Sequence, residues 1–219
     1  MSKVHEALSC ISWFAALNPA LQDALIARGK LERTAAGRWL FGEGNVMDHA
    51  ALIVAGTAGI YRSVAASRSV LVGIVGPGTL VGQVHSFPGE LPYTAIARSD
   101  VVMVHFPRAF GDPGRQNGDI SSVFARLLAG QLATTLQRTA DRTSLAPLAR
   151  VAAEIAYLAG QFGEDPVQTS QDELGEMIGL SRKTVNRCLG ELAKQGAIIN
   201  GYAELRIRDA RKLQAAITD

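Results

Sequence analysis

Basic and amide side chains gather on a short stretch near the C-terminal end of the chain. The charged residues between positions 181 and 194 sum to +3; they are Arg182, Lys183, Arg187 and Lys194 against Glu191. Residues 147–219 together carry nine basic and ten acidic groups, so this excess of positive charge is local. Arginine can donate two hydrogen bonds to guanine O6 and N7, and asparagine, present here as Asn186, can pair in a similar way with adenine. The stretch therefore predicts a surface that reads DNA in the major groove.

Helix-capping residues around this stretch indicate two short helices joined by a tight turn. Ser170 followed by Glu173 is a capping box, in which the serine oxygen accepts from a backbone N–H and the glutamate reaches back to the cap. Gly179 ends that helix, and Ser181 can cap a second helix that runs to about Gln195. The apolar residues of the second helix share one side; they are Val185, Cys188, Leu189 and Leu192. The pattern predicts a helix-turn-helix, the alternative being a helical hairpin with an ordinary solvated face.

A β-hairpin is expected directly after the second helix. Residues 197–199 and 204–207 form two short apolar runs around Asn200-Gly201, a dipeptide that favours tight hairpin turns. The hairpin makes the predicted motif a winged helix-turn-helix. The candidate DNA contacts lie at the starts of the two helices and on the outer face of the second; they are Ser170, Gln171, Ser181, Arg182, Lys183, Thr184, Asn186 and Arg187.

The preceding residues must position this motif, and their pattern changes twice. Residues 1–29 read as short helices, whereas residues 30–107 contain short extended runs separated by glycines, which is typical of a small antiparallel sandwich or barrel. From Gly118 onward apolar residues recur at helical spacing over about 25 residues and form two adjoining stripes. We expect one stripe to pack on the β domain and the other on a second copy of the chain, the alternative being a helix packed wholly on its own domain. Pro147 marks a joint before the next helix.

Composition excludes several classes of protein. Of the 219 residues, 47% are hydrophobic and 19% are charged, with a net charge of +2, which is incompatible with a disordered or low-complexity chain. The two cysteines cannot supply a disulfide framework or the four thiolates of an ordinary iron–sulfur cluster. No apolar run approaches the roughly 20 residues that span a bilayer, and no convincing leader cleavage site follows the N-terminus. We therefore expect a cytoplasmic protein without a membrane partner.

With these motifs the chain resembles the CRP/FNR family of bacterial transcription regulators over nearly its full length. Residues 180–187, Leu-Ser-Arg-Lys-Thr-Val-Asn-Arg, are similar to the family's recognition-helix motif. Further upstream, the chain is similar to the family at the glycine landmarks of its cyclic-nucleotide-type β-roll; these are Phe41-Gly-Glu-Gly44, Gly56, Pro77-Gly-Thr-Leu-Val-Gly82 and Thr94-Ala-Ile-Ala97.

The resemblance implies a fold and a mode of action. The fold is α+β, with an N-terminal antiparallel, jelly-roll-like β-roll sensor domain at 1–117, a long dimerisation helix and hinge at 118–146, and a C-terminal winged helix-turn-helix at 147–219. The family also implies a homodimer that binds a palindromic operator in double-stranded DNA, with half-sites about one helical turn, or about 34 Å, apart. RNA polymerase is a candidate partner.

The sensor half departs from the family's cyclic-AMP-binding members. In those members the glycine matching Gly82 is followed by a glutamate that holds the ribose, and an arginine ten residues later binds the cyclic phosphate. Gln83 and Tyr93 stand at these positions here. Tyrosine brings no charge to a phosphate anion, whereas an arginine–phosphate pair is a strong contact. We therefore expect no control by cyclic AMP. The candidate effector-pocket residues are Gly82, Gln83, Tyr93, Thr94, Leu136 and Gln137.

The recognition helix also departs from the cyclic-AMP-type members. They carry a glutamate directly after the recognition arginine, where it can accept a hydrogen bond from cytosine N4. This chain has Lys183 at that position, a donor that favours guanine or phosphate. The half-site is therefore expected to differ from the cyclic-AMP consensus.

Two alternatives stay open for the β domain. The first is a haem-dependent gas- or redox-sensing regulator of the same family, which would use a histidine such as His85 as a ligand of the haem iron. His49 and His105, in or beside strands, are the other histidines of this region. The Cys-x-His pair of the haem-binding CO sensor is missing. A cupin-type enzyme would collect metal ligands as His-x-His, a spacing that the four histidines never show. We expect no catalytic residues, no metal and no bound cofactor.

Overall fold

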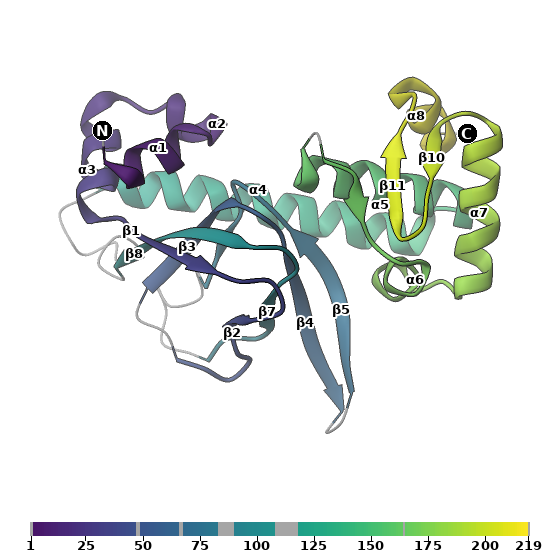
Figure 1. The fold of residues 1–219 in the computed structure, drawn as a ribbon, viewed down its shortest axis with the longest axis horizontal. Helices are drawn as coiled ribbons and strands as arrows, with labels where there is room; N and C mark the ends of the chain where they lie inside the picture. The colour runs from purple at the N-terminus through teal and green to yellow at the C-terminus, as the bar shows by residue number, and fades with distance from the viewer. Residues whose placement is uncertain are drawn as a thin grey trace. The chain divides into compact units, whose positions relative to one another are not determined.

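Two structural units make up the computed structural model, which describes residues 2–46, 49–65, 68–82, 90–107, 118–163 and 165–218. The first unit contains residues 1–69 and 74–132, and the second contains residues 70–73 and 133–219 (Figure 1). Among the described residues, no helix is both long enough and apolar enough to cross a membrane.

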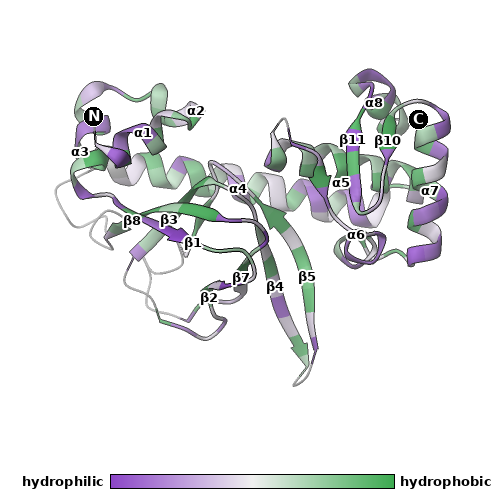
Figure 2. Ribbon diagram, in the orientation of Figure 1, coloured by the Kyte–Doolittle hydropathy of each residue, from purple (hydrophilic) through white to green (hydrophobic). Residues whose placement is uncertain are grey.

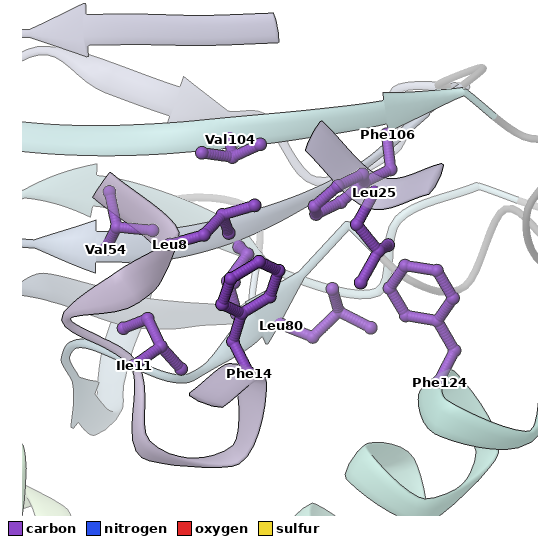
Figure 3. Close-up of a cluster of buried hydrophobic side chains, with 10 residues drawn as sticks. Leu8, Ile11, Phe14, Leu25, Val54, Leu80, Val104, Phe106 and Phe124 are labelled. Carbon is purple, nitrogen blue, oxygen red and sulfur yellow. The ribbon is translucent and has the colours of Figure 1, made fainter. Parts of the chain in front are cut away.

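The short helices predicted for residues 1–29 are α1 (Lys3–Ser9), α2 (Ser12–Ala15) and α3 (Pro19–Arg28). The Asn18 side chain accepts a hydrogen bond from the Leu21 N–H at 2.9 Å, and Pro19 occupies the first turn of α3, where no N–H is needed. Burial of apolar side chains fixes these helices against the strands. The buried cluster contains Leu8, Ile11, Phe14, Leu25, Leu52, Val54, Leu80, Val104, Phe106 and Phe124 (Figure 3).

The β domain contains two four-stranded sheets, ordered β1-β8-β3-β6 and β2-β7-β4-β5. The strands are β1 (Lys30–Thr34), β2 (Trp39–Phe41), β3 (His49–Ala55), β4 (Ala58–Ala65), β5 (Arg68–Val75), β6 (Leu80–Val81), β7 (Thr94–Ala97) and β8 (Val101–Pro107). β1 and β3 pair antiparallel with β8, β6 pairs with β3, and β2 and β4 pair with β7. Apolar side chains from both sheets form a second buried cluster, which includes Phe41, Ile53, Ala95, Val101 and Met103. The predicted antiparallel β-roll is therefore confirmed.

Gly56, one of the predicted glycine landmarks, lies in the turn between β3 and β4 with a φ of +78°. A Cβ atom at this position would lie 2.1 Å from the backbone oxygen of Asp100, so no L side chain fits. The neighbouring Thr57 N–H donates to the Ser99 hydroxyl at 3.0 Å. A glycine is therefore required for the close approach of these two turns.

The long helix predicted from the sequence is α4 (Gly118–Ser144), which runs for 27 residues. Phe124, near its start, packs edge-on against Phe106 of β8 with the ring centroids 5.6 Å apart. Further along the helix, Leu132 and Leu136 are 60% and 61% exposed. One side of α4 is therefore packed, while large aliphatic side chains on another side stay uncovered in the single chain.

In the second unit a new helix, α5 (Pro147–Phe162), begins at the predicted joint. Ala146 has an extended backbone, and Pro147 is the first residue of the helix. The elements that follow are β9 (Val167–Gln168), α6 (Gln171–Ile178), α7 (Arg182–Lys194), β10 (Ile198–Asn200), β11 (Glu204–Ile207) and α8 (Ala210–Thr218). The strands form one antiparallel sheet ordered β10-β11-β9. The sequence predicted the two helices and the hairpin but missed β9, which is two residues long, and α8, whose buried anchor is Leu213 alone.

Candidate nucleic-acid interface and effector pocket

The predicted capping box forms at the start of α6. The Ser170 hydroxyl accepts from the Glu173 N–H at 3.2 Å, and the Glu173 carboxylate accepts from the Ser170 N–H at 2.8 Å. These two contacts satisfy backbone donors that a helix start leaves without partners. Ser170 and the next residue, Gln171, are half-buried at this end of α6.

Two glycines shape the tight turn between α6 and α7. Gly179 has a left-handed backbone with a φ of 69° and ends α6. Gly175, one turn earlier, lies so close to the following segment that a Cβ atom would be 2.5 Å from the backbone oxygen of Leu180. The Leu180 N–H donates to the Gly175 carbonyl at 3.0 Å, and Ser181 then caps α7 by accepting from the Thr184 N–H at 3.2 Å. The turn thus fixes the position of the first turn of α7 relative to α6.

The two sides of α7 differ as the sequence predicted, and hydrophilic residues alternate with apolar ones along this helix in Figure 2. The inner side is buried and consists of Val185, Cys188, Leu189 and Leu192. Burial raises the pKa of the Cys188 thiol, while Arg187 lowers it to a lesser degree, so Cys188 is a neutral packing residue. Of the candidate DNA contacts on α7 and its cap, Thr184 is half-buried and the others are exposed; these are Ser181, Arg182, Lys183, Asn186 and Arg187.

Sequence reasoning missed one residue at this surface. The Arg182 guanidinium donates from Nη1 to Oδ2 of Asp172 at 3.0 Å, which joins the first turn of α7 to the first turn of α6. The two side chains are 69% and 64% exposed, so the pair lies in solvent. The available signal was an acidic residue in the first turn of the preceding helix, but only the crossing of α6 and α7 brings the two charges together.

The hairpin predicted after α7 is present, but its turn lies further along the chain than the predicted Asn200-Gly201, because Asn200 belongs to β10 and pairs with Leu205. β10 and β11 pair antiparallel, and the Gly201 N–H closes the turn by donating to the Glu204 carbonyl at 2.8 Å. Tyr202, at the tip, is fully exposed. The neighbouring Ala203 adopts a φ of 52° and its carbonyl accepts from the Thr169 N–H at 3.1 Å, which ties the hairpin to the segment before α6.

Two of the predicted effector-pocket residues contact each other in the first unit. The Gly82 N–H donates to the Tyr93 hydroxyl at 3.0 Å. Burial raises the pKa of this phenol, and the hydrogen bond from Gly82 lowers it to a smaller extent, so Tyr93 is neutral. The next residue, Thr94, accepts from the Glu43 N–H through its hydroxyl at 3.0 Å.

Of the remaining predicted effector residues, one lies outside the described residues and two belong to the second unit. Gln83 lies outside the described residues, as does the haem-ligand candidate His85. Leu136 and Gln137 lie on α4 within the second unit, where Leu136 is exposed and the Gln137 amide donates to Asp141 at 2.8 Å.

A basic side chain is present near Tyr93, but it is already paired. Arg62 of β4 donates from Nη1 to the Glu43 carboxylate at 2.7 Å and also to the carbonyl of Pro92. The Glu43 carboxylate further accepts from the Ser63 N–H at 2.9 Å. The contacts with Ser63, and then the charge of Arg62, lower the pKa of Glu43. The carboxylate thus competes with any anion for this guanidinium.

A second polar cluster lies at the end of the first sheet. A cavity of about 460 Å³ is lined by Lys30, Leu31, Glu32, His49, His105, Phe106 and Pro107. The rings of His49 and His105 meet edge-on with centroids 4.7 Å apart, and His105 Nε2 is 3.1 Å from Glu32 Oε2. Burial lowers the pKa of His105 despite the opposing charge of Glu32. Within the described part of the chain, no three such side chains are arranged to hold a metal ion.

Comparison with known proteins matches both halves of the chain. A sequence model of the cyclic nucleotide-binding domain matches residues 31–110, and one of the Crp-like helix-turn-helix domain matches residues 149–216. The chain is 29% identical over 186 residues to a CRP-like cAMP-activated global transcriptional regulator of Mycobacterium tuberculosis, covering 81% of this chain and 83% of that protein. It is 28% identical over 147 residues to the transcriptional regulator SdrP of Thermus thermophilus, covering 64% of this chain and 70% of that protein.

Solved structures support the same fold. A CRP/FNR-family transcriptional regulator of Thermus thermophilus superposes with a TM-score of 0.72 at 22% identity, over 87% of this chain and 99% of that one. FixK2 of Bradyrhizobium japonicum superposes with a TM-score of 0.72 at 18% identity, over 86% and 96% of the two chains. A β-roll of the cyclic-nucleotide-binding type followed by a Crp-like helix-turn-helix identifies the chain as a member of the CRP/FNR family of transcription regulators.

Proposed function

We propose that this regulator binds a two-fold symmetric DNA operator as a homodimer and that cyclic AMP does not control it. The observation that carries the proposal is the outer face of α7, on which Arg182, Lys183 and Arg187 are exposed. An α-helix fits the major groove of B-DNA, and arginine and asparagine side chains there can distinguish base pairs. The buried inner face of α7 holds this basic face in a constant orientation.

The proposed dimer forms along α4. Leu132 and Leu136 are four residues apart, so they lie on the same side of the helix, and both are more than half exposed. Uncovered aliphatic side chains at this spacing support pairing with a second copy. Two copies of α7 would then read half-sites about 34 Å apart. In this proposal residues 1–117 act as the sensor, 118–146 as the dimerisation helix and hinge, and 147–219 as the DNA-binding domain.

Tyr93 supports the proposal that cyclic AMP is not the effector. Where the family resemblance places a phosphate-binding arginine, the neutral Tyr93 hydroxyl accepts a hydrogen bond from the Gly82 N–H. A phenol supplies no charge to a cyclic phosphate, whereas arginine makes charge-assisted, bidentate contacts with phosphate. The Mycobacterium tuberculosis relative is cAMP-activated by its name and 29% identical. We propose that the two proteins differ in this response.

Selection of bound duplexes from a random DNA pool, with and without cyclic AMP or cyclic GMP, tests the proposal. We expect an inverted-repeat sequence that is enriched equally under all conditions, and light scattering should give twice the mass of one chain. Enrichment of a single half-site, a strictly monomeric mass, or recovery of DNA only with cyclic AMP would each contradict the part of the proposal that it addresses.

We extend the proposal to cofactor and partner. The protein acts without haem, and it contacts RNA polymerase at its promoters, as the family resemblance implies. A Soret band in the spectrum of the pure protein would contradict the first statement. Transcription in vitro from a template that carries the selected operator, with and without the protein, tests the second.

A further inference from the structure

We propose that Asp172 is a positioning residue that sets the base preference of Arg182. The inference rests on the proposed DNA binding and deepens it. Its starting observation is the 3.0 Å contact between Arg182 Nη1 and Asp172 Oδ2, which links the two helices of the helix-turn-helix at their first turns. Asp172 itself was not among the predicted DNA contacts.

The backbones at both ends of this contact are held firmly. Asp172 follows the Ser170 capping box, and the helix that carries it is anchored by the buried side chains of Leu174, Met177 and Ile178. Arg182 follows the Ser181 cap and the turn closed by the Leu180–Gly175 hydrogen bond. The meeting of the two charges therefore follows from the packed core of the motif and needs no loop rearrangement.

The contact is not explained by stability. Both side chains are about two-thirds exposed, at 69% and 64%, and ion pairs between exposed groups contribute little to the free energy of folding. The same contact gains importance at a DNA surface. A guanidinium has five N–H donors in a rigid fork. One nitrogen pairs with Asp172, and the remaining donors suffice for guanine O6 and N7.

Asp172 is proposed to act in two ways. It restricts the rotamers of Arg182 before DNA arrives, so less conformational freedom is lost when the correct base is contacted. It also places a negative charge close to the duplex. Because the phosphates repel this charge, it weakens complexes in which Arg182 would otherwise move to a phosphate. Both effects increase discrimination at one base pair and lower the affinity for unrelated DNA.

The test compares the full-length wild type with Asp172→Asn on three duplexes. These are the selected operator, the operator changed at the base pair whose discrimination is lost in Arg182→Ala, and a scrambled duplex. We expect the wild type to discriminate about tenfold or more at that base pair. In Asp172→Asn this ratio should fall to about threefold or less, while binding to the scrambled duplex tightens by about threefold.

Two further variants separate positioning from simple charge. Glu191, on the same helix as Arg182, is exposed and accepts from the Gln195 side chain at 3.1 Å, so Glu191→Gln removes one negative charge without touching Arg182. This variant should tighten binding to all three duplexes by similar factors and leave the ratio unchanged. Asp172→Glu keeps the carboxylate and should restore the ratio to within about twofold of the wild type.

The outcomes distinguish this inference from the proposed function. If Asp172→Asn keeps the wild-type ratio, or if Glu191→Gln narrows the ratio as much, the positioning role is wrong although DNA binding stands. If the wild type binds no duplex at low ionic strength, the proposed function fails and the inference with it. Because the charge of Asp172 also favours the start of α6, thermal unfolding of each variant confirms that it is folded at the assay temperature.

Discussion

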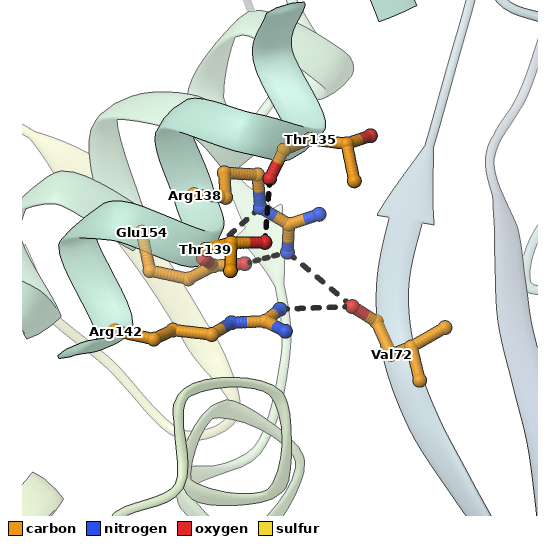
Figure 4. A network of polar contacts seen from close by, with 6 residues as sticks. All are labelled: Val72, Thr135, Arg138, Thr139, Arg142 and Glu154. Carbon is orange, nitrogen blue, oxygen red and sulfur yellow. Dashed lines mark hydrogen bonds and ion pairs between the residues drawn. The ribbon is translucent and has the colours of Figure 1, made fainter. Parts of the chain in front are cut away.

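Arg138 of α4 and Glu154 of α5 form a buried ion pair across the joint between these two helices (Figure 4). Arg138 donates from Nη2 to Glu154 Oε1 at 2.5 Å and from Nε to Oε2 at 3.3 Å, and the side chains are only 15% and 4% exposed. The guanidinium also lies 4.1 Å from the centre of the Tyr157 ring. One turn further on α4, Arg142 donates to the Val72 carbonyl at 3.1 Å. The pair therefore fixes the end of α4 to the second turn of α5.

Removing one partner of this pair should destabilise the second unit strongly. Glu154→Leu leaves the Arg138 charge buried without its carboxylate, and Arg138→Leu leaves Glu154 in the same position. Each single change should cost about 3–5 kcal/mol in the free energy of unfolding, whereas the double change to leucine should cost much less, because no uncompensated charge remains. Urea unfolding of the four proteins measures the coupling. Additive effects of the two single changes would contradict this account.

A methyl group at Gly175 should disrupt the turn of the helix-turn-helix. In Gly175→Ala the new Cβ would lie 2.5 Å from the Leu180 backbone oxygen, so the turn must shift, at an expected cost of about 1–3 kcal/mol. Gly190→Ala on α7 is the matched control, because nothing lies within 4 Å of its Cβ position. The control should raise stability by up to about 1 kcal/mol through helix propensity. Equal effects of the two changes on the unfolding midpoint would rule out a steric role for Gly175.

The stability of the first unit should fall in mild acid because of His105. Its folded-state pKa lies below the ordinary value of 6.5, first because of burial and then because of His49, while Glu32 acts in the opposite direction. As the pH falls below 6.5, the unfolded chain takes up the proton first, so the free energy of unfolding decreases until the pH passes the folded-state pKa. His105→Gln should flatten this part of the pH profile. A profile with the same slope in His105→Gln and in the wild type would contradict this account.

Replacing the exposed leucines of α4 by acids should separate dimerisation from base reading. Leu132→Glu and Leu136→Glu together place four like charges at the proposed dimer seam, so light scattering should report a monomer. Affinity for the full operator should then fall by about 100-fold or more, while contact with a single half-site persists. Both side chains are already exposed in the single chain, so the monomeric variant should still be folded, which circular dichroism checks. An unchanged dimer would place the interface elsewhere.

Arg182 should recognise one base pair, whereas Lys183 should strengthen binding to DNA of any sequence. Arg182→Ala is expected to cost about 1–3 kcal/mol for the operator and to relax preference at a single position. If Lys183 contacts phosphate, Lys183→Ala should weaken binding to all sequences similarly and reduce its dependence on salt concentration. Competition binding against operators substituted at each position distinguishes the two. If Arg182→Ala bound all these duplexes as the wild type does, the base-reading assignment would be wrong.

Much of the fold could be predicted because its signals are local. The Ser170 capping box and the end of α6 at Gly179 each depend on residues that are close in sequence, and each forms as expected. The hairpin after α7 also forms, although its turn lies beyond the predicted Asn200-Gly201. The glycine-separated runs of the β-roll and the apolar spacing of α4 likewise reflect strand and helix periods. A two-residue strand such as β9 is too short to show a period, and it exists because β11 pairs with it.

The sequence by itself determined where the helices of the DNA-reading motif begin and end, since capping and side-chain periodicity act within one or two turns of the chain. The tertiary structure alone decided which charges meet: Asp172 with Arg182, and Arg138 with Glu154. It also brought the Gly82 N–H to the Tyr93 hydroxyl. These partners belong to different elements, so their separation depends on how the elements pack and cross, a property that no residue spacing along the chain specifies.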